Sequence, residues 1–168
     1  MSAITAEPIR TDRLTLLPLR VEHAGEMAAA LADPDLHAFI GGAPLSRHDL
    51  RARYGRLVAG SPDPAVSWCN WVLRLDGPGC LVGTAQATIS ADGPTAEVAW
   101  VVGTAWQGQG IATEAARALV AWLGQQSVPV VIAHIHPDHL ASAAVAAAAG
   151  LTPTDERQDG ERRWCLNR

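Results

Sequence analysis

The sequence predicts an α/β fold, in one domain over residues 1–168, built on a mixed and mostly antiparallel sheet. Apolar residues make up 48% of the 168 residues and charged residues 18%, which is typical of a globular chain with a single core. Segments with strand and helix patterns alternate along the chain. A glycine-containing loop also joins a buried strand to a helix, which favours a parallel crossover at that point.

The first part of the chain predicts a strand followed by two helices. The expected ranges are 13–19 for the strand, 21–31 for the first helix and 46 to about 59 for the second. Asp33-Pro34-Asp35 ends the first helix, because proline cannot continue it. Ser46 is a good N-cap for the second helix.

The middle of the chain predicts three strands joined as antiparallel hairpins. They are expected at residues 66–75, 80–89 and 95–102. The breaks between them, Asp76-Gly77-Pro78-Gly79 and Asp92-Gly93-Pro94, are rich in turn-forming residues.

The last part predicts the crossover. After a loop at 103–110, the expected elements are a helix at 111–126, a buried strand at 128–135, an alanine-rich helix at 138–149 and a short strand at 162–166. Gly150 marks the end of the second of these helices. The sheet is therefore expected to be antiparallel first, with one parallel crossover around the glycine loop.

Composition excludes several classes of function. All 13 basic residues are arginine, so a lysine Schiff base, a Walker A lysine and a lysine general base are excluded. The net charge is −4 and no basic stripe occurs, which argues against a nucleic-acid partner and suits a cationic substrate.

The remaining composition predicts a cytoplasmic protein with no membrane partner. The longest stretch of low polarity, residues 143–151, is too short to span a bilayer, and the N-terminus lacks the apolar core of a signal peptide. The three cysteines, Cys69, Cys80 and Cys165, form no C-x-x-C pair, so reduced thiols are expected rather than a disulfide or zinc site.

The most informative segment is the loop at residues 101–113. A buried strand ends, glycines follow and a helix starts, so free backbone N–H groups and the helix dipole can bind a phosphate there. A dinucleotide fingerprint is excluded, because Thr113 replaces its third glycine and no Asp or Glu occurs from 115 to 137. An ordinary strand-to-helix turn, with glycines for tight packing, remains the alternative.

Three motifs resemble a known family. Gln107-Gly108-Gln109-Gly110-Ile111-Ala112 matches the Q/R-x-x-G-x-G/A motif of the GNAT superfamily of acyl-CoA N-acyltransferases. Thr113-Glu114-Ala115 and the opening Asp12-Arg13-Leu14-Thr15-Leu16 resemble the branch that acetylates ribosomal-protein N-termini. The resemblance extends from Arg13 to Trp164.

The resemblance implies a sheet splayed at an acetyl-CoA cleft, between the strands at 95–102 and 128–135, with helices on both faces and no metal. The backbone of Val101 and Val102 would pair with the pantetheine arm, and a backbone N–H there would polarise the thioester carbonyl. The residues implied for the pyrophosphate are Gln107, Gly108, Gln109, Gly110, Ile111, Ala112 and Thr113.

The helix after the second cleft strand adds two expected cofactor contacts. Ser142 matches the serine of the family's N-x-x-S pattern, which often lies near the cofactor sulfur, and could protonate the leaving thiolate. His139 stands where the family has asparagine, and its imidazole could still bond the pantetheine. The alternative for Ser142 is a hydrogen bond to the helix backbone. The tyrosine with which the family often protonates the thiol is absent, since the sole tyrosine is Tyr54.

Glu97 is the first candidate for the general base. It lies among apolar residues of its strand, and a base aids transfer because alkyl amines are protonated at neutral pH. The alternative is a structural ion pair with an arginine such as Arg74. His134 and His136 share one face of their strand and could relay protons, although such histidines are more often simply hydrogen-bonded.

Four aromatic side chains are expected to wall the amine pocket: His37, Phe39, Trp68 and Trp100. Trp68 and Trp71 are three residues apart, so in a strand they face opposite sides. Arg47, Arg51 and Arg56 on the second helix are expected to form a solvated face.

Together these features predict an acetyl-CoA-dependent N-acetyltransferase that acts by direct transfer, without an acetyl-cysteine intermediate. The acceptor would be a peptide or protein N-terminus, or a small amine. A non-catalytic acyl-CoA sensor and a general nucleotide-binding module are the rival hypotheses. A homodimer is common in the branch that the sequence resembles.

Overall fold

The computed structural model describes residues 3–168, apart from the side chain of Ile40. The strands are β1 (Ile9–Arg10), β2 (Leu14–Pro18), β3 (Val66–Leu75), β4 (Cys80–Ser90), β5 (Thr95–Val102), β6 (Val130–Ile135), β7 (Thr152–Gln158) and β8 (Glu161–Asn167). The helices are α1 (Ala24–Ala30), α2 (His37–Ile40), α3 (Arg47–Ala59), α4 (Ile111–Gln125) and α5 (Leu140–Ala148), with short 3₁₀ turns at Val21–His23, Pro34–Leu36 and Thr104–Trp106.

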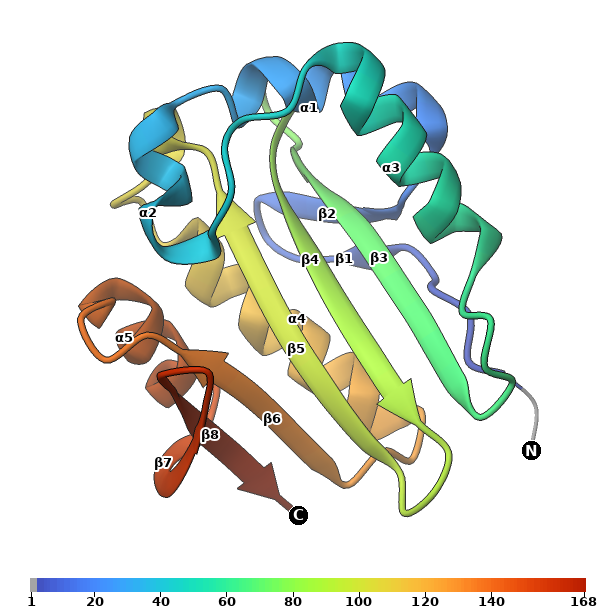
Figure 1. Cartoon of the computed structure of the whole chain (residues 1–168), viewed down its shortest axis with the longest axis vertical. Coiled ribbons are helices and arrows are strands. Elements are labelled where there is room, and N and C mark those ends of the chain that lie inside the picture. The colour runs from blue at the N-terminus through green and yellow to red at the C-terminus, as the bar shows by residue number, and fades with distance from the viewer. Residues whose placement is uncertain (1–2) are drawn as a thin grey trace.

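All eight strands form one open sheet in the order β1-β2-β3-β4-β5-β6-β8-β7 (Figure 1). Every neighbouring pair is antiparallel except β5 and β6, which run parallel and are joined by α4. The predicted α/β class, with a mostly antiparallel sheet and one crossover, is confirmed. No helix in the described part of the chain is long and apolar enough to cross a membrane.

The contact between β5 and β6 is short. Their register covers three pairs, of which the last is Glu97 with Ile132, whereas β4 and β5 pair over eight residues up to Val102. Beyond Glu97 the two strands diverge, as Figure 1 shows. The edge of β5 that faces β6 therefore has no strand partner along its last residues.

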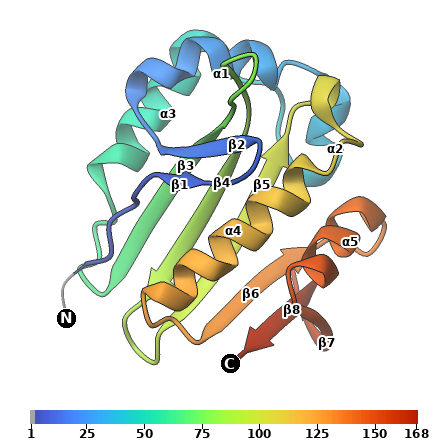
Figure 2. The same ribbon diagram turned by 180° about the vertical axis from the view of Figure 1, so that it is seen from behind.

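Helices cover both faces of the sheet. On one face α4 lies across the strands (Figure 2) and buries Ile111, Leu119 and Leu123 in the main core. On the other face α1 and α3 cover a smaller core, which includes Val72 and Leu81 of the sheet. Side chains alternate between the two faces along β3, so Trp71 and Val72 point to opposite faces. One strand therefore contributes to both cores.

Three elements were not predicted from the sequence: β1, α2 and β7. β1 has only two residues and α2 only four, too few to give a period. β7 carries the polar sequence Thr-Pro-Thr-Asp-Glu-Arg-Gln and is almost entirely exposed, so it lacks the apolar alternation of a half-buried strand. Its partner β8 and the turn between them place it in the sheet.

Candidate active site

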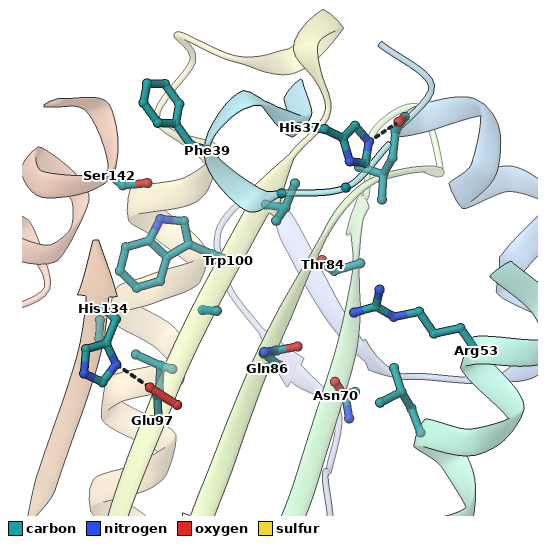
Figure 3. Close-up of a pocket in the computed structure, with 18 of the residues that line it drawn as sticks. His37, Phe39, Arg53, Asn70, Thr84, Gln86, Glu97, Trp100, His134 and Ser142 are labelled. Atoms are coloured by element: carbon teal, nitrogen blue, oxygen red, sulfur yellow. Dashed lines mark hydrogen bonds and ion pairs between the residues drawn. The ribbon is translucent and has the colours of Figure 1, made fainter. Parts of the chain in front are cut away.

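A cavity of about 740 Å³ opens on the α3 face of the sheet where β5 and β6 diverge. Its floor comes from β3, β4, β5 and β6, and its walls come from the α2 segment, α3, the start of α5 and the β7–β8 turn. Figure 3 shows its side chains converging from these separate elements. The cavity therefore lies beside the unpaired edge of β5.

Glu97 belongs to a chain of charged and polar side chains that crosses four strands. Its Oε1 makes a short hydrogen bond with Nδ1 of His134 (Figure 3). Nε2 of His134 lies 3.2 Å from Nε of Arg163, and Nη1 of Arg163 lies 3.0 Å from Oε2 of Glu156. Arg74, the example given for an alternative ion pair with Glu97, instead pairs with Asp76 at 3.1 Å, at the end of β3.

This chain fixes the tautomer of His134. A guanidinium has only donors, so Nε2 of the neutral ring accepts from Arg163 and the ring hydrogen lies on Nδ1, facing Glu97. The His134 side chain is 8% exposed, whereas that of Glu97 is 44% exposed. The histidine is therefore held between two fixed partners, and the carboxylate of Glu97 is the member of the pair that opens to the cavity.

A second group of side chains lies at the start of α5. Oγ of Ser142 is 3.4 Å from Nε2 of His139. The ring of His139 stacks on Phe39 from α2, with centroids 4.4 Å apart and planes 7° apart. Burial, and after it electrostatic repulsion from His136, lowers the pKa of His139 below its ordinary value of 6.5, so this ring is neutral at pH 7, with one nitrogen that donates a hydrogen bond and one that accepts.

The loop before α4 has a backbone conformation that favours glycine at two positions. Gly108 and Gly110 both have φ of +77°, the left-handed region that glycine adopts without strain. Nε2 of Gln107 donates to the carbonyl of Val102 at 2.9 Å. The side chain of Gln107 thus ties the loop back to the end of β5, and the loop runs directly into the first turn of α4.

The two motifs that resemble the ribosomal-protein acetyltransferase branch, at residues 12–16 and 113–115, contact each other beside this loop. The carboxylate of Glu114 accepts hydrogen bonds from the hydroxyl of Thr11 and from the backbone and side chain of Arg13. Nη1 of Arg13 also donates to the carbonyl of Gln109 at 2.9 Å. Arg13 and Glu114 therefore clamp the glycine loop from the side of β2.

The cavity brings together most of the predicted catalytic and acceptor residues. Its lining includes Glu97, Ser142, His139, His37, Phe39, Trp100 and Val101. His37 is anchored by a 3.2 Å contact between its Nε2 and the carbonyl of Leu31. Trp100 points into the gap between β5 and β6 (Figure 3).

Other predicted residues lie outside the cavity. Val102 is buried, and the loop and helix residues 107–113 lie beyond the cavity lining. Trp68 lines a separate, shallower cavity of about 390 Å³ near the N-terminal segment, so it does not wall the space around Glu97. Trp71 faces the opposite side of the sheet and is fully buried, as its spacing predicts.

The polar residues of the cavity that sequence reasoning missed include Arg53, Asn70, Thr84, Gln86, Asp159 and Glu161. For Arg53 a signal was available. The inward side of α3 carries Leu50, Tyr54 and Leu57, and Arg53 is three residues after Leu50 and four before Leu57. It therefore lies beside the inward face of the helix and lines the cavity, which Arg51 and Arg56 do not, although its side chain is exposed.

No group of three or more His, Cys, Asp or Glu side chains in the described residues could hold a metal ion. The chain does, however, match a family model. The model described as an acetyltransferase (GNAT) domain matches residues 13–152. No curated relative matches the chain by sequence.

Solved structures match at low identity over nearly the full length. An acetyltransferase of the GNAT family from Bacillus anthracis is 18% identical, with 96% of this chain and 98% of that chain covered and a TM-score of 0.78. RimL, a ribosomal L7/L12 α-N-protein acetyltransferase solved with coenzyme A, is 16% identical over 96% and 98%, with a TM-score of 0.77. AAC(6')-Ib, solved with paromomycin and acetyl-CoA, is 20% identical over 94% of each chain, with a TM-score of 0.75.

At such identities these structures establish a shared fold, and the molecules named with them, a ribosomal protein and paromomycin, differ widely. The family model covers most of the chain, including β5, the glycine loop and the start of α5. The chain belongs to the GNAT acetyltransferase family.

Proposed function

We propose that this protein is an acetyl-CoA-dependent N-acetyltransferase that transfers the acetyl group directly to a primary amine. The observation that carries the proposal is the placement of Glu97. Its half-exposed carboxylate, held by His134, faces a cavity of about 740 Å³ beside the open edge of β5. Solved relatives in complex with coenzyme A or acetyl-CoA support the donor.

The donor side of the site has two suitable features. The unpaired edge of β5 offers the backbone of Val101 and Val102 to the pantetheine arm, which would add like an extra strand. Residues 108–113, with two glycines in the left-handed region, offer backbone N–H groups to the pyrophosphate at the start of α4, whereas the N–H of Gln107 donates to the carbonyl of Thr104. His139 and Ser142 lie where the pantetheine would end.

The bound donor supplies an acyl group activated as a thioester. On the acceptor side, Glu97 takes a proton from the ammonium group, and the neutral nitrogen forms the new N–C bond as the C–S bond breaks. Ser142 delivers a proton to the departing sulfur and takes in its place the second proton, which the nitrogen loses as the amide forms. His134 keeps the Glu97 carboxylate in place through Nδ1, so that its other oxygen faces the acceptor.

The test is free-thiol release from acetyl-CoA against a panel of peptides and small amines. Glu97→Gln should lower kcat by about 10²- to 10⁴-fold with unchanged acetyl-CoA affinity, because a general base contributes that much. His134→Ala should cause a smaller loss, of roughly tenfold, because the carboxylate remains but loses its anchor. Affinity is followed by calorimetric titration with acetyl-CoA.

Glu22→Gln is the matched control. It removes the same charge from an exposed pair with Arg20, on the turn before α1, and should leave both rate and affinity unchanged. Tight binding of acetyl-CoA with no thiol release from any acceptor would support the acyl-CoA sensor instead. Full activity of the Glu97→Gln variant would remove Glu97 from the mechanism and leave catalysis to positioning alone.

A further inference from the structure

The α3 side of the cavity has a floor of polar side chains that make no hydrogen bonds to other described residues. Asn70 on β3 and Gln86 on β4 are cross-strand neighbours, and Thr84 lies on the same face two residues further along β4. Within residues 3–168 the side chains of these three residues make no hydrogen bond to another residue. Their amide and hydroxyl groups are therefore available to a bound molecule.

Arg53 lines the same cavity as Asn70, Thr84 and Gln86. Figure 3 shows its guanidinium reaching from α3 towards Thr84, Gln86 and Asn70. No carboxylate in the described part of the chain pairs with it, in contrast to Arg13, Arg74 and Arg163. The side chain of Arg53 is exposed at the cavity, so its guanidinium is free to pair with a ligand that carries a negative charge.

The neighbour of Arg53 does not supply that charge. Tyr54 is 4% exposed, and burial raises the pKa of Tyr54 to about 12, in spite of the opposing charge of Arg53. Its phenol therefore stays neutral throughout the physiological range and does not pair with the guanidinium of Arg53.

The negative side chains of the cavity lie at the other side of it. Glu97 is on β5, and Asp159 and Glu161 come from the β7–β8 turn beyond β6. Arg53 is the sole arginine in the cavity lining, on the β3 side. The cavity thus has a negative end, where an ammonium group would lose its proton to Glu97, and a positive end over the polar floor.

The separation of the two ends limits the acceptor. Asn70 and Glu97 lie two strands apart, which is roughly 10 Å across the sheet. A free α-amino acid carries its amine and carboxylate on one carbon and cannot span that distance. An extended peptide advances about 3.5 Å per residue, so a carboxylate on its second or third residue reaches the guanidinium.

We infer that the acceptor is a peptide N-terminus with an acidic residue at its second or third position. This inference rests on the proposed function and names its substrate class. The amine faces Glu97, and the peptide carboxylate pairs with the fork of Arg53 while Asn70, Thr84 and Gln86 bond the remaining polar atoms. A polycationic acceptor is disfavoured, because it would bring positive charge to Arg53.

The experiment measures kcat/KM for tetrapeptide amides that differ only in Glu, Gln or Lys at position two or three. The Glu peptide should exceed the Gln peptide by about tenfold or more, chiefly through KM, because a charge-assisted hydrogen bond contributes to binding of substrate and transition state alike. The preference should weaken at high salt. In the Arg53→Gln variant the ratio should fall to about one.

Arg51→Gln is the matched control, since Arg51 lies on the outer side of the same helix and the control should keep the Glu preference. Three outcomes would each overturn the inference but leave the protein an acetyltransferase. The first is equal kcat/KM for the Glu and Gln peptides in the unaltered enzyme. The second is a Glu preference that survives Arg53→Gln, and the third is faster acetylation of a Lys peptide or a polyamine. Release of thiol from no amine at all would overturn the proposed function itself.

Discussion

At the scale of single residues, the contact between Arg13 and Glu114 links two motifs that lie about 100 positions apart in the chain. Burial alone would raise the pKa of Glu114, but the hydrogen bonds from Thr11 and Arg13 and the charge of Arg13 outweigh it and lower the pKa. The charged form is thus the one that the fold stabilises. Because Arg13 also bonds the carbonyl of Gln109, this stabilisation extends to the loop before α4.

Glu114→Gln tests this contact. A lowered pKa means that the contribution is present at pH 7 and is lost as the pH falls through the folded pKa. The variant should therefore be less stable than the unaltered protein by about 1 kcal/mol at pH 7, a modest value because Arg13 is 45% exposed. The difference should shrink below about pH 4.5, the ordinary value of a glutamate. Urea unfolding between pH 3 and 7 measures it. A constant difference across that range would contradict the assignment.

At the scale of elements, β4 must approach β5 closely where the cavity begins. A Cβ added at Gly83 would lie 2.2 Å from the carbonyl oxygen of Val101 and 3.1 Å from Cα of Val102. Both atoms are backbone, so neither can turn aside. Gly83 therefore fixes the position of the end of β5, whose other edge is proposed to bind the pantetheine arm.

Gly83→Ala should be destabilising because it overpacks a strand contact. The expected loss is about 1–3 kcal/mol, or a fall in Tm of roughly 5–10 °C. The affinity for acetyl-CoA should fall as well, since the displaced backbone belongs to Val101. Gly77→Ala is the control, because a Cβ there meets no atom within 4 Å. Thermal unfolding followed by circular dichroism compares the two, and equal Tm values would show that β5 moves without cost.

The sequence predicted elements well where local chemistry decides the outcome. Ser46 caps α3 through a 3.0 Å hydrogen bond from the backbone of Asp49, and β3 and β5 have the predicted bounds. The β7–β8 hairpin was missed although Asp159-Gly160 is a strong turn signal, and both residues have positive φ. Polar strands such as β7 form because a partner strand binds them, which periodicity does not reveal.

At the scale of the whole molecule, the sheet consists of two parts that meet over three residue pairs. β1 to β5 form one part and β6, β8 and β7 the other. The glycine loop and Glu97 could be located from local patterns, whereas the pairing of Glu97 with His134 and the position of Arg53 depend on how these parts and α3 come together. Such contacts join distant segments, so residue spacing alone could not identify them.

A donor that binds across this junction should stabilise the whole fold. Coenzyme A at a free concentration of 100 times its Kd should add about 2.7 kcal/mol, or roughly 5–10 °C in Tm. NAD at the same concentration should give no shift, because the third glycine and the acidic residue of a dinucleotide site are absent. Differential scanning fluorimetry measures both. An equal shift with NAD would favour the general nucleotide-binding module.

The two edge strands of the sheet, β1 and β7, are poorly suited to pair with a strand from another molecule. β1 offers two residues, and β7 offers a proline followed by three charged residues, Asp155, Glu156 and Arg157. Bare strand edges tend to recruit further strands, and shortness, proline and charge all prevent this. Copies of this protein should therefore not join edge to edge into a continuous sheet, even at the high concentrations of an expression host. A homodimer would have to form through helices or sheet faces instead.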